Sequence, residues 1–280
     1  MTPAHAPAEP FFLASAPGER FCLFHPAQGE CTGALVYVHP FAEEMNKSRR
    51  MAALQARALA AQGCAVLQID LHGCGDSDGD FGQARWEQWK ADIGAACSWL
   101  ARRSGQPVGL WGLRLGALLA LDYAHGAPQA PARLVLWQPV TSGAAFLTQF
   151  LRLRLASDML GEAEGNGGNG GTVALRAALA AGEALEIGGY LLSPQLAAAI
   201  EGLDAAALAP PCATDWFDIV AAPDRPVSPV AQRLAAAWQA NPPALRKVAC
   251  PPFWSTQEIT ESEALVAATC AALREHIHAA

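Results

Sequence analysis

The chain has 280 residues, enough for one large α/β domain or two small ones. Hydrophobic residues make up 52% and charged residues 16%, which favours a sizeable core and argues against disorder. The formal net charge of −7 argues against a general nucleic-acid binder, which usually has a basic face. Gly, Pro or charged residues interrupt the apolar stretches well before the ~20 residues of a membrane helix, so no membrane span is expected.

The N-terminal residues and the cysteines indicate the cellular compartment in which the protein is expected. Residues 1–10 lack the basic and apolar regions of a secretory signal. The eight cysteines form no C-x-x-C pair and no cluster with metal-ligand spacing, and most lie in apolar runs, where a reduced Cys acts as a small core residue. We therefore predict a cytoplasmic protein with reduced thiols and with neither a metal nor another cofactor.

The first half of the chain alternates between apolar runs rich in β-formers and segments of helical periodicity. Strands are predicted, in order, over residues 11–14, 20–24, 33–38, 64–70, 107–111 and 132–137. Between them, Asn46 caps a helix that ends at Gly63, and apolar residues recur at helical spacing from Trp86 to Leu100. This alternation predicts a mostly parallel, doubly wound sheet that binds ligands at the carboxyl ends of its strands.

The alternation fails over residues 141–208, which hold a glycine tract at 165–171 and alanine-rich helical stretches. The tract predicts a mobile loop, and an insertion at this point predicts a helical cap over the upper edge of the sheet. The alternative is a packed helical subdomain with no gating role. Residues 1–140 and 209–280 would then form the core.

The last part of the chain returns to the α/β pattern. Strands are predicted over residues 214–220 and 245–250. Ser228 and Pro229 begin the helix between them, and a capping box from Thr260 to Glu263 opens the final helix.

The most informative motif is Gly112-Leu-Arg-Leu-Gly116, between a predicted strand and a predicted helix. Its spacing is that of the nucleophile elbow, G-x-S-x-G, in which a sharp turn presents the central side chain above a sheet. Arg114 holds the central position, and arginine stays protonated, so it cannot be a nucleophile. The motif therefore predicts the scaffold of an acyl-transfer site without its reactive atom.

This elbow, the order of strands and an insertion after the sixth strand resemble the α/β-hydrolase superfamily over nearly the whole chain. The segments 39–50, HPFAEEMNKSRR, and 70–79, DLHGCGDSDG, together with the elbow, resemble exosortase A system-associated hydrolases of the second type. The resemblance implies a bacterial ester or acyl hydrolase with a small-molecule or acyl substrate. It also implies a link to exopolysaccharide and protein-sorting machinery, including a protein partner there.

The superfamily pattern implies where a catalytic triad would lie. It implies oxyanion-hole amides near Phe41 and at Leu115, and Asp224 as the acid after the penultimate strand. Asp224 also fits a simple turn beside proline. The loop that should carry the histidine, residues 251–258, has none, and the histidines at 276 and 278 come too late in the chain. The standard Ser-His-Asp mechanism is therefore not supported.

Two other residues are candidates for chemistry at the same edge of the sheet. Cys74 follows His72 by two residues, and a thiolate beside an imidazole can attack an acyl group. His39 ends the third strand and can donate a proton or a hydrogen bond. The alternatives are a structural Cys74 and a His39 that orders its own loop.

Arg114 itself leaves two interpretations open. An unpaired buried charge is costly, so Glu43 or Glu44 in the facing loop can pair with the guanidinium and lock the site. Alternatively, Arg114 and the Leu115 amide bind a carboxylate or phosphate on a ligand. The sequence therefore carries two functions forward: an acyl hydrolase with a departed mechanism, or a non-catalytic fold that binds an anionic ligand or a partner protein.

Overall fold

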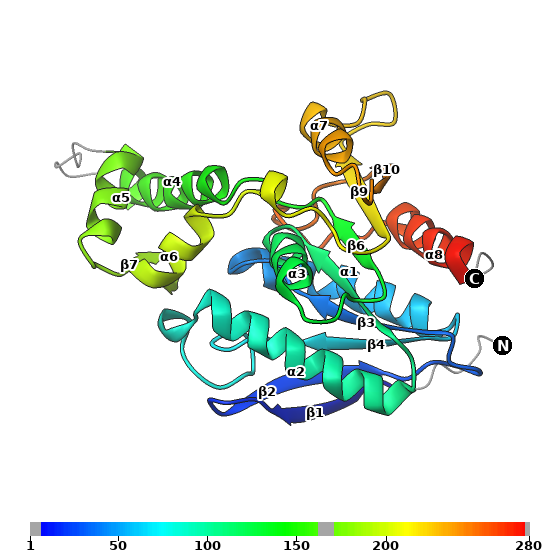
Figure 1. The fold of residues 1–280 in the computed structure, drawn as a ribbon. Coiled ribbons are helices and arrows are strands. Elements are labelled where there is room, and N and C mark those ends of the chain that lie inside the picture. The colour runs from blue at the N-terminus through cyan, green and yellow to red at the C-terminus, as the bar shows by residue number, and fades with distance from the viewer. Residues whose placement is uncertain (1–6, 162–170, 278–280) are drawn as a thin grey trace.

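A computed structural model describes residues 7–161 and 171–277, and it contains a sheet of eight strands in the order β1-β2-β4-β3-β5-β6-β9-β10 (Figure 1). The strands of this sheet are β1 (Glu9–Ala14), β2 (Glu19–His25), β3 (Gly33–Val38), β4 (Cys64–Ile69), β5 (Val108–Leu113), β6 (Leu134–Trp137), β9 (Thr214–Val220) and β10 (Ala244–Ala249). Strands β1 and β2 pair antiparallel, and β2 is antiparallel to β4. All the remaining pairs in this sheet are parallel, so the predicted doubly wound α/β-hydrolase fold is confirmed.

Helices cover both faces of the sheet. The helices that flank it are α1 (Glu43–Ala60), α2 (Trp86–Ser104), α3 (Leu115–Gly126), α7 (Pro229–Ala237) and α8 (Glu263–Ile277), with a short 3-10 helix η1 (Phe81–Gln83) before α2. In β3, Val36 belongs to the core under α2 and α3, whereas its neighbour Leu35 belongs to the core under α1 and α8. Because successive side chains of a strand point to opposite faces, an unbroken apolar run fills both cores.

Two helices begin at other residues than the sequence indicates. Helix α1 begins at Glu43 rather than after Asn46, because Ala42 takes a positive φ of 50° and turns the chain directly into the helix. The side chain of Asn46 instead donates to the Tyr190 hydroxyl, at 3.2 Å. At α8 the cap is Ser262, whose Oγ accepts from the Leu265 amide at 3.2 Å, and not Thr260.

Between β6 and β9 the chain leaves the sheet and forms a group of helices and a two-stranded hairpin to one side of it (Figure 1). These elements are α4 (Gly143–Gly161), α5 (Gly171–Ala180), β7 (Leu185–Ile187), β8 (Tyr190–Leu192), α6 (Pro194–Glu201) and the 3-10 helix η2 (Ala205–Ala207). Residues 165–170 of the glycine tract lie outside the described residues. Its contacts with the rest of the chain include the Tyr190 hydrogen bond, the hydrogen bond that Arg85 donates to Ser193 Oγ at 3.1 Å, and the packing of Phe150 against Phe41.

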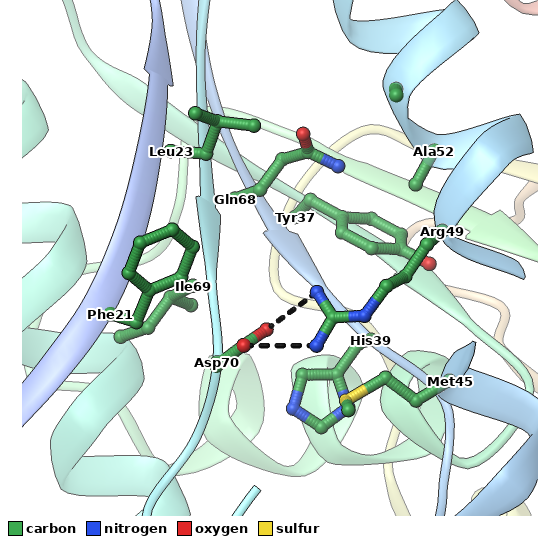
Figure 2. Close-up of a pocket in the computed structure, with 11 residues that line it drawn as sticks. Phe21, Leu23, Tyr37, His39, Met45, Arg49, Ala52, Gln68, Ile69 and Asp70 are labelled. Carbon is green, nitrogen blue, oxygen red and sulfur yellow. Dashed lines mark hydrogen bonds and ion pairs between the residues drawn. The ribbon is translucent and has the colours of Figure 1, made fainter. Parts of the chain in front are cut away.

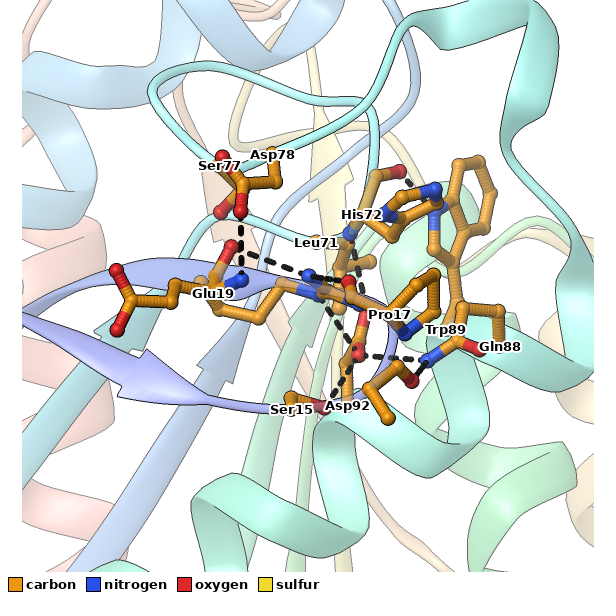
Figure 3. Close-up of polar contacts among 12 residues, drawn as sticks. Ser15, Pro17, Glu19, Leu71, His72, Ser77, Asp78, Gln88, Trp89 and Asp92 are labelled. Atoms are coloured by element: carbon orange, nitrogen blue, oxygen red, sulfur yellow. Dashed lines mark hydrogen bonds and ion pairs between the residues drawn. The ribbon is translucent and has the colours of Figure 1, made fainter.

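A buried ion pair joins the hairpin β1–β2 to α2 (Figure 3). Arg20 Nε lies 2.8 Å from Asp92 Oδ1, and neither side chain is exposed. Asp92 also accepts hydrogen bonds from Ser15 Oγ, Gln88 Nε2 and the backbone amide of His72. Both carboxylate oxygens are thus satisfied, whereas Arg20 Nε and Nη2 have no hydrogen bond of good geometry among the described residues, so the charge of Asp92 is what compensates the buried guanidinium.

We expect Asp92→Ala to lower the free energy of unfolding by about 3–5 kcal/mol, because it leaves the Arg20 charge buried without a partner. Urea denaturation followed by circular dichroism measures this change. Glu9→Ala is the matched control, because Glu9 and Arg103 form an exposed pair 3.7 Å apart, worth less than about 1 kcal/mol. Equal losses for the two variants would contradict the role of the buried pair.

Candidate functional site

The Gly112–Gly116 segment forms a sharp turn from β5 into α3. Arg114 takes φ 56° and ψ −119°, a conformation that side chains rarely adopt. A Cβ on Gly112 would lie 2.5 Å from the Ala117 Cα, and one on Gly116 would overlap the His39 carbonyl oxygen. Both glycines are therefore required by close backbone packing, whatever side chain stands at position 114.

The Arg114 side chain lies between α1 and the loop that follows β10. Its Nε donates to Glu44 Oε1 at 3.3 Å, and its guanidinium carbon lies 5.3 Å from the centre of the Trp254 ring. Such a contact between a cation and an aromatic face is attractive. Trp254 comes from residues 251–258, the loop in which the superfamily pattern implies a histidine. No local sequence pattern predicts this contact, because it joins segments 140 residues apart.

Arg114 and Glu44 also line a cavity of about 240 Å³. Its other charged residues are Glu43 and Lys47, which pair at 3.1 Å, so the charges around the cavity cancel. The remaining lining is mostly apolar and aromatic and comes from the loop before α1, from α4 and from the loop after β10: Phe41, Phe146, Gln149, Phe150, Leu153, Trp254 and Ser255.

Glu44 is incompletely satisfied in this arrangement. Burial raises the pKa of its carboxyl group, and the charge and hydrogen bond of Arg114 act against that rise. Its Oε1 bonds to Arg114, whereas its Oε2 is buried with no hydrogen-bond partner among the described residues. A carboxylate oxygen in that position favours a proton or an external donor.

The backbone turns sharply into a helix on both sides of the cavity. Ala42, at the start of α1, takes φ 50° and ψ −126°, close to the conformation of Arg114 at the start of α3. Leu115 provides the first amide of α3, a position that has no acceptor within its own helix. Phe41 is buried among aromatic rings, with the Phe150 ring 5.0 Å away, and this packing holds the first loop in place.

His39 is held by backbone groups at both ring nitrogens. Its Nδ1 donates to the Pro40 carbonyl at 2.7 Å, and its Nε2 accepts from the Leu71 amide at 3.2 Å. Burial lowers the pKa of the imidazole and favours this neutral form. The ring thus connects the ends of β3 and β4 and has no nitrogen left for proton exchange with a ligand.

Cys74 lies behind the elbow, where it lines a small cavity together with His39, Phe41 and Leu115. Its thiol is buried, and burial followed by the nearby Asp70 charge raises its pKa, so the unreactive thiol form prevails. The Nδ1 atom of His72 has no hydrogen-bond partner among the described residues, so it forms no bond to this thiol.

Asp224 does not join the other candidates. It is exposed in the turn that follows β9, and it is absent from the lining of the elbow cavity. The buried acid of this region is Asp218, within β9, whose carboxylate accepts from the Ser228 amide at 2.7 Å and from its Oγ at 3.1 Å. Asp218 therefore helps to fix the start of α7. Of the late histidines, His276 lies in α8 and His278 lies outside the described residues.

A second cavity, of about 180 Å³, lies on the other side of α1 (Figure 2). Asp70 accepts from both terminal nitrogens of Arg49, at 3.0 and 3.3 Å, and Tyr37 and Gln68 stand nearby in the cavity wall. In the sequence, Asp70 and Arg49 stand out only as parts of the segments 70–79 and 39–50. Their pairing is not visible in a sequence because the helix register and the end of β4 must both be known.

Two classes of site are not found in the part of the chain that the structure describes. Within residues 7–161 and 171–277, no group of three or more His, Cys, Asp or Glu residues is placed to hold a metal ion. No helix in these ranges is long and apolar enough to cross a membrane. All eight cysteines are free thiols.

Comparisons with known proteins support the fold described above. The family model for serine aminopeptidase, S33, matches residues 29–164. No curated protein matches the sequence. Est1E from Butyrivibrio proteoclasticus, solved with ferulic acid bound, is 14% identical; the match covers 96% of this chain and 99% of that one, with a TM-score of 0.68.

Two further solved structures are similar in fold. A soluble variant of monoglyceride lipase from Saccharomyces cerevisiae is 12% identical, with 99% of this chain and 97% of that chain covered and a TM-score of 0.63. Mouse alpha/beta hydrolase domain-containing protein 10 is 15% identical, with 97% and 99% covered and a TM-score of 0.58. At these identities the structures establish the fold alone. The chain therefore has the α/β-hydrolase fold, and the family model over residues 29–164 is similar to its first half.

Proposed function

We propose that this protein is a non-catalytic α/β-hydrolase-fold protein that binds a small anionic molecule with an apolar body at Arg114. The observation that carries the proposal is the place of the guanidinium. It occupies the elbow itself, lies 18% exposed between Glu44 and Trp254, and lines the 240 Å³ cavity.

The groups needed for acyl transfer support the non-catalytic reading. A nucleophile requires a base within hydrogen-bond reach, or a depressed pKa of its own. Arg114 offers no nucleophile, and Trp254 lies beside it in the loop of the missing histidine. The ring nitrogens of His39 are occupied, and the pKa of the Cys74 thiol is raised.

The polar end of the cavity favours an anion. A guanidinium presents five donors, and the bond to Glu44 uses the one at Nε. In our proposal the terminal nitrogens bind the ligand. The first amides of α3 and the helix dipole add to the attraction of a carboxylate or phosphate at this point.

The rest of the cavity favours an apolar body on the same molecule. Phe146, Phe150 and Leu153 project from α4, so this helix serves in our proposal as a cap that covers the ligand. Est1E, which shares the fold, was solved with ferulic acid, an aromatic carboxylic acid. An amphipathic carboxylic acid is therefore the ligand class that we propose for this chain.

The cellular setting belongs to the proposal as well. The segments 39–50 and 70–79 resemble exosortase A system-associated hydrolases, which favours a ligand or protein partner from exopolysaccharide or protein-sorting systems in a bacterium. We propose a cytoplasmic location, and fractionation of the host cell, followed by immunoblotting, tests it. Recovery of the protein outside the cytoplasmic fraction would contradict that location.

Arg114→Gln should weaken the binding of octanoate by about ten- to a hundredfold, because charge-assisted hydrogen bonds contribute roughly 1.5–3 kcal/mol. Isothermal titration calorimetry measures this change. Arg152→Gln removes an exposed arginine from α4 and should leave the affinity unchanged. Octan-1-ol, which lacks the charge, should bind both variants and the original protein equally. The proposal fails if octanoate does not bind, or binds equally well without Arg114.

Ester hydrolysis is the readout that separates binding from catalysis. We expect no turnover of p-nitrophenyl butyrate above the background of the assay, and none after Arg114→Ser, because a restored hydroxyl still has no imidazole beside it. Turnover by the original protein that is lost on Arg114→Gln or on Cys74→Ser would instead establish an enzyme with a departed mechanism.

A further inference from the structure

We propose that Glu44 competes with the bound anion for Arg114, and that each anion bound at the elbow is accompanied by a proton taken up by Glu44. This inference rests on the proposed function, since it describes how the same site exchanges its internal anion for an external one.

The Glu44 carboxylate, with a side chain 22% exposed, is less well satisfied than three buried carboxylates of the chain. Asp92, Asp70 and Asp215 each use both oxygens: Asp215, for example, accepts from Arg133 and Arg246, at 2.7 Å each. Glu44 has one hydrogen bond, at 3.3 Å, and its other oxygen is buried and unpartnered among the described residues. Because it has fewer hydrogen bonds than these three carboxylates, its contact with Arg114 is the easier one to exchange.

Two positively charged side chains face Glu44. Arg114 approaches from the start of α3, and Lys47 from α1, but the Lys47 ammonium is already paired with Glu43. The cavity residues from α4 and from the loop after β10 carry no charge: Phe146, Gln149, Phe150, Leu153, Trp254 and Ser255. The hydroxyl of Tyr37, from β3, is neutral at ordinary pH, because burial raises its pKa further. Arg114 is therefore the main counter-ion of Glu44.

A bound anion changes the electrostatic environment of the Glu44 carboxyl group. It brings a second negative charge to the guanidinium and withdraws part of the positive charge that stabilises the Glu44 carboxylate. Burial already favours the protonated form of Glu44, and the ligand charge adds to that preference. A proton on Glu44 removes the repulsion between the two anions, and the new O–H can donate to the ligand. The proton comes from solvent, and no covalent bond to the ligand forms.

The coupling between anion binding and proton uptake determines how the dissociation constant changes with pH. Where Glu44 is ionised in the free protein and protonated in the complex, binding takes up one proton, so the dissociation constant rises tenfold for each unit of pH. At pH values below the pKa of Glu44 in the free protein, the proton is already present and the affinity no longer changes. Octanoate itself stays ionised above about pH 6, so its own titration does not produce the effect.

The test measures octanoate binding by calorimetry at several values between about pH 6 and about pH 8.5. At each pH, two buffers of different ionisation enthalpy give the number of protons taken up. We expect close to one proton for each octanoate and a tenfold loss of affinity per pH unit in the upper part of this range. This measurement needs no variant, so it does not depend on the folding of a mutant.

Glu44→Gln keeps the shape of the side chain and removes its charge. We expect this variant to bind octanoate more tightly at the upper end of the range, at least tenfold, with no proton uptake and no dependence on pH. Glu43→Gln is the matched control, because Glu43 is the neighbouring residue, 59% exposed and paired with Lys47, and it should keep the wild-type pH profile.

The outcomes separate this inference from the proposed function. Binding that depends on Arg114 but shows no proton uptake and no pH dependence would overturn the role of Glu44 and leave the anion site intact. If the unmodified protein does not bind octanoate, the proposed function fails and this inference fails with it.

Discussion

The close packing of α3 against the end of β3 is the constraint on which the site depends. Gly116 lies against the carbonyl oxygens of Val38 and His39, and Gly112 lies against Ala117, so neither position has room for a side chain. The chain between them must therefore turn within one residue, and Arg114 takes a rarely populated conformation as a result. That conformation presents whatever side chain stands at 114 at the carboxyl edge of the sheet. The packing fixes the place of the residue, and the sequence is free to choose its chemistry.

Once arginine occupies this position, the surrounding residues must accommodate a half-buried cation. Glu44, from the first turn of α1, provides the opposite charge, and Trp254, from the loop after β10, provides an aromatic face. A buried charge without such partners would cost several kcal/mol. The contrast with the Arg20–Asp92 pair is informative, because that pair is fully buried and its carboxylate satisfied at both oxygens. In our proposal, the less satisfied contact of Glu44 is the one that exchanges with a ligand.

The sequence predicted features whose cause is local and failed where the cause is distant. The β3 run and the 112–116 turn were predicted because burial on two faces and a glycine pair leave local patterns. The start of α1 was misplaced, since the Ala42 turn that begins the helix has no cap residue to mark it. Pairing of Arg114 with Glu43 or Glu44 was anticipated, but the choice of Glu44 required the helix register. The contact with Trp254 required the path of the loop after β10, which no local pattern encodes.

The retained elbow also explains why likeness of fold says little about reaction in this chain. Catalysis at such a turn requires a nucleophile and a base, whereas the turn itself requires only two glycines and a helix packed on a strand. The backbone contacts that form the turn are the same with serine or with arginine at position 114. The stability of the fold therefore does not require a nucleophile or a base at this site. A turn that presents one side chain at a cavity suits anion binding as well as acyl transfer, because both need groups aimed at a developing or fixed negative charge. In our proposal, the step from an enzyme to a binding protein on this fold begins with the residue at 114 and with the loop that contains Trp254.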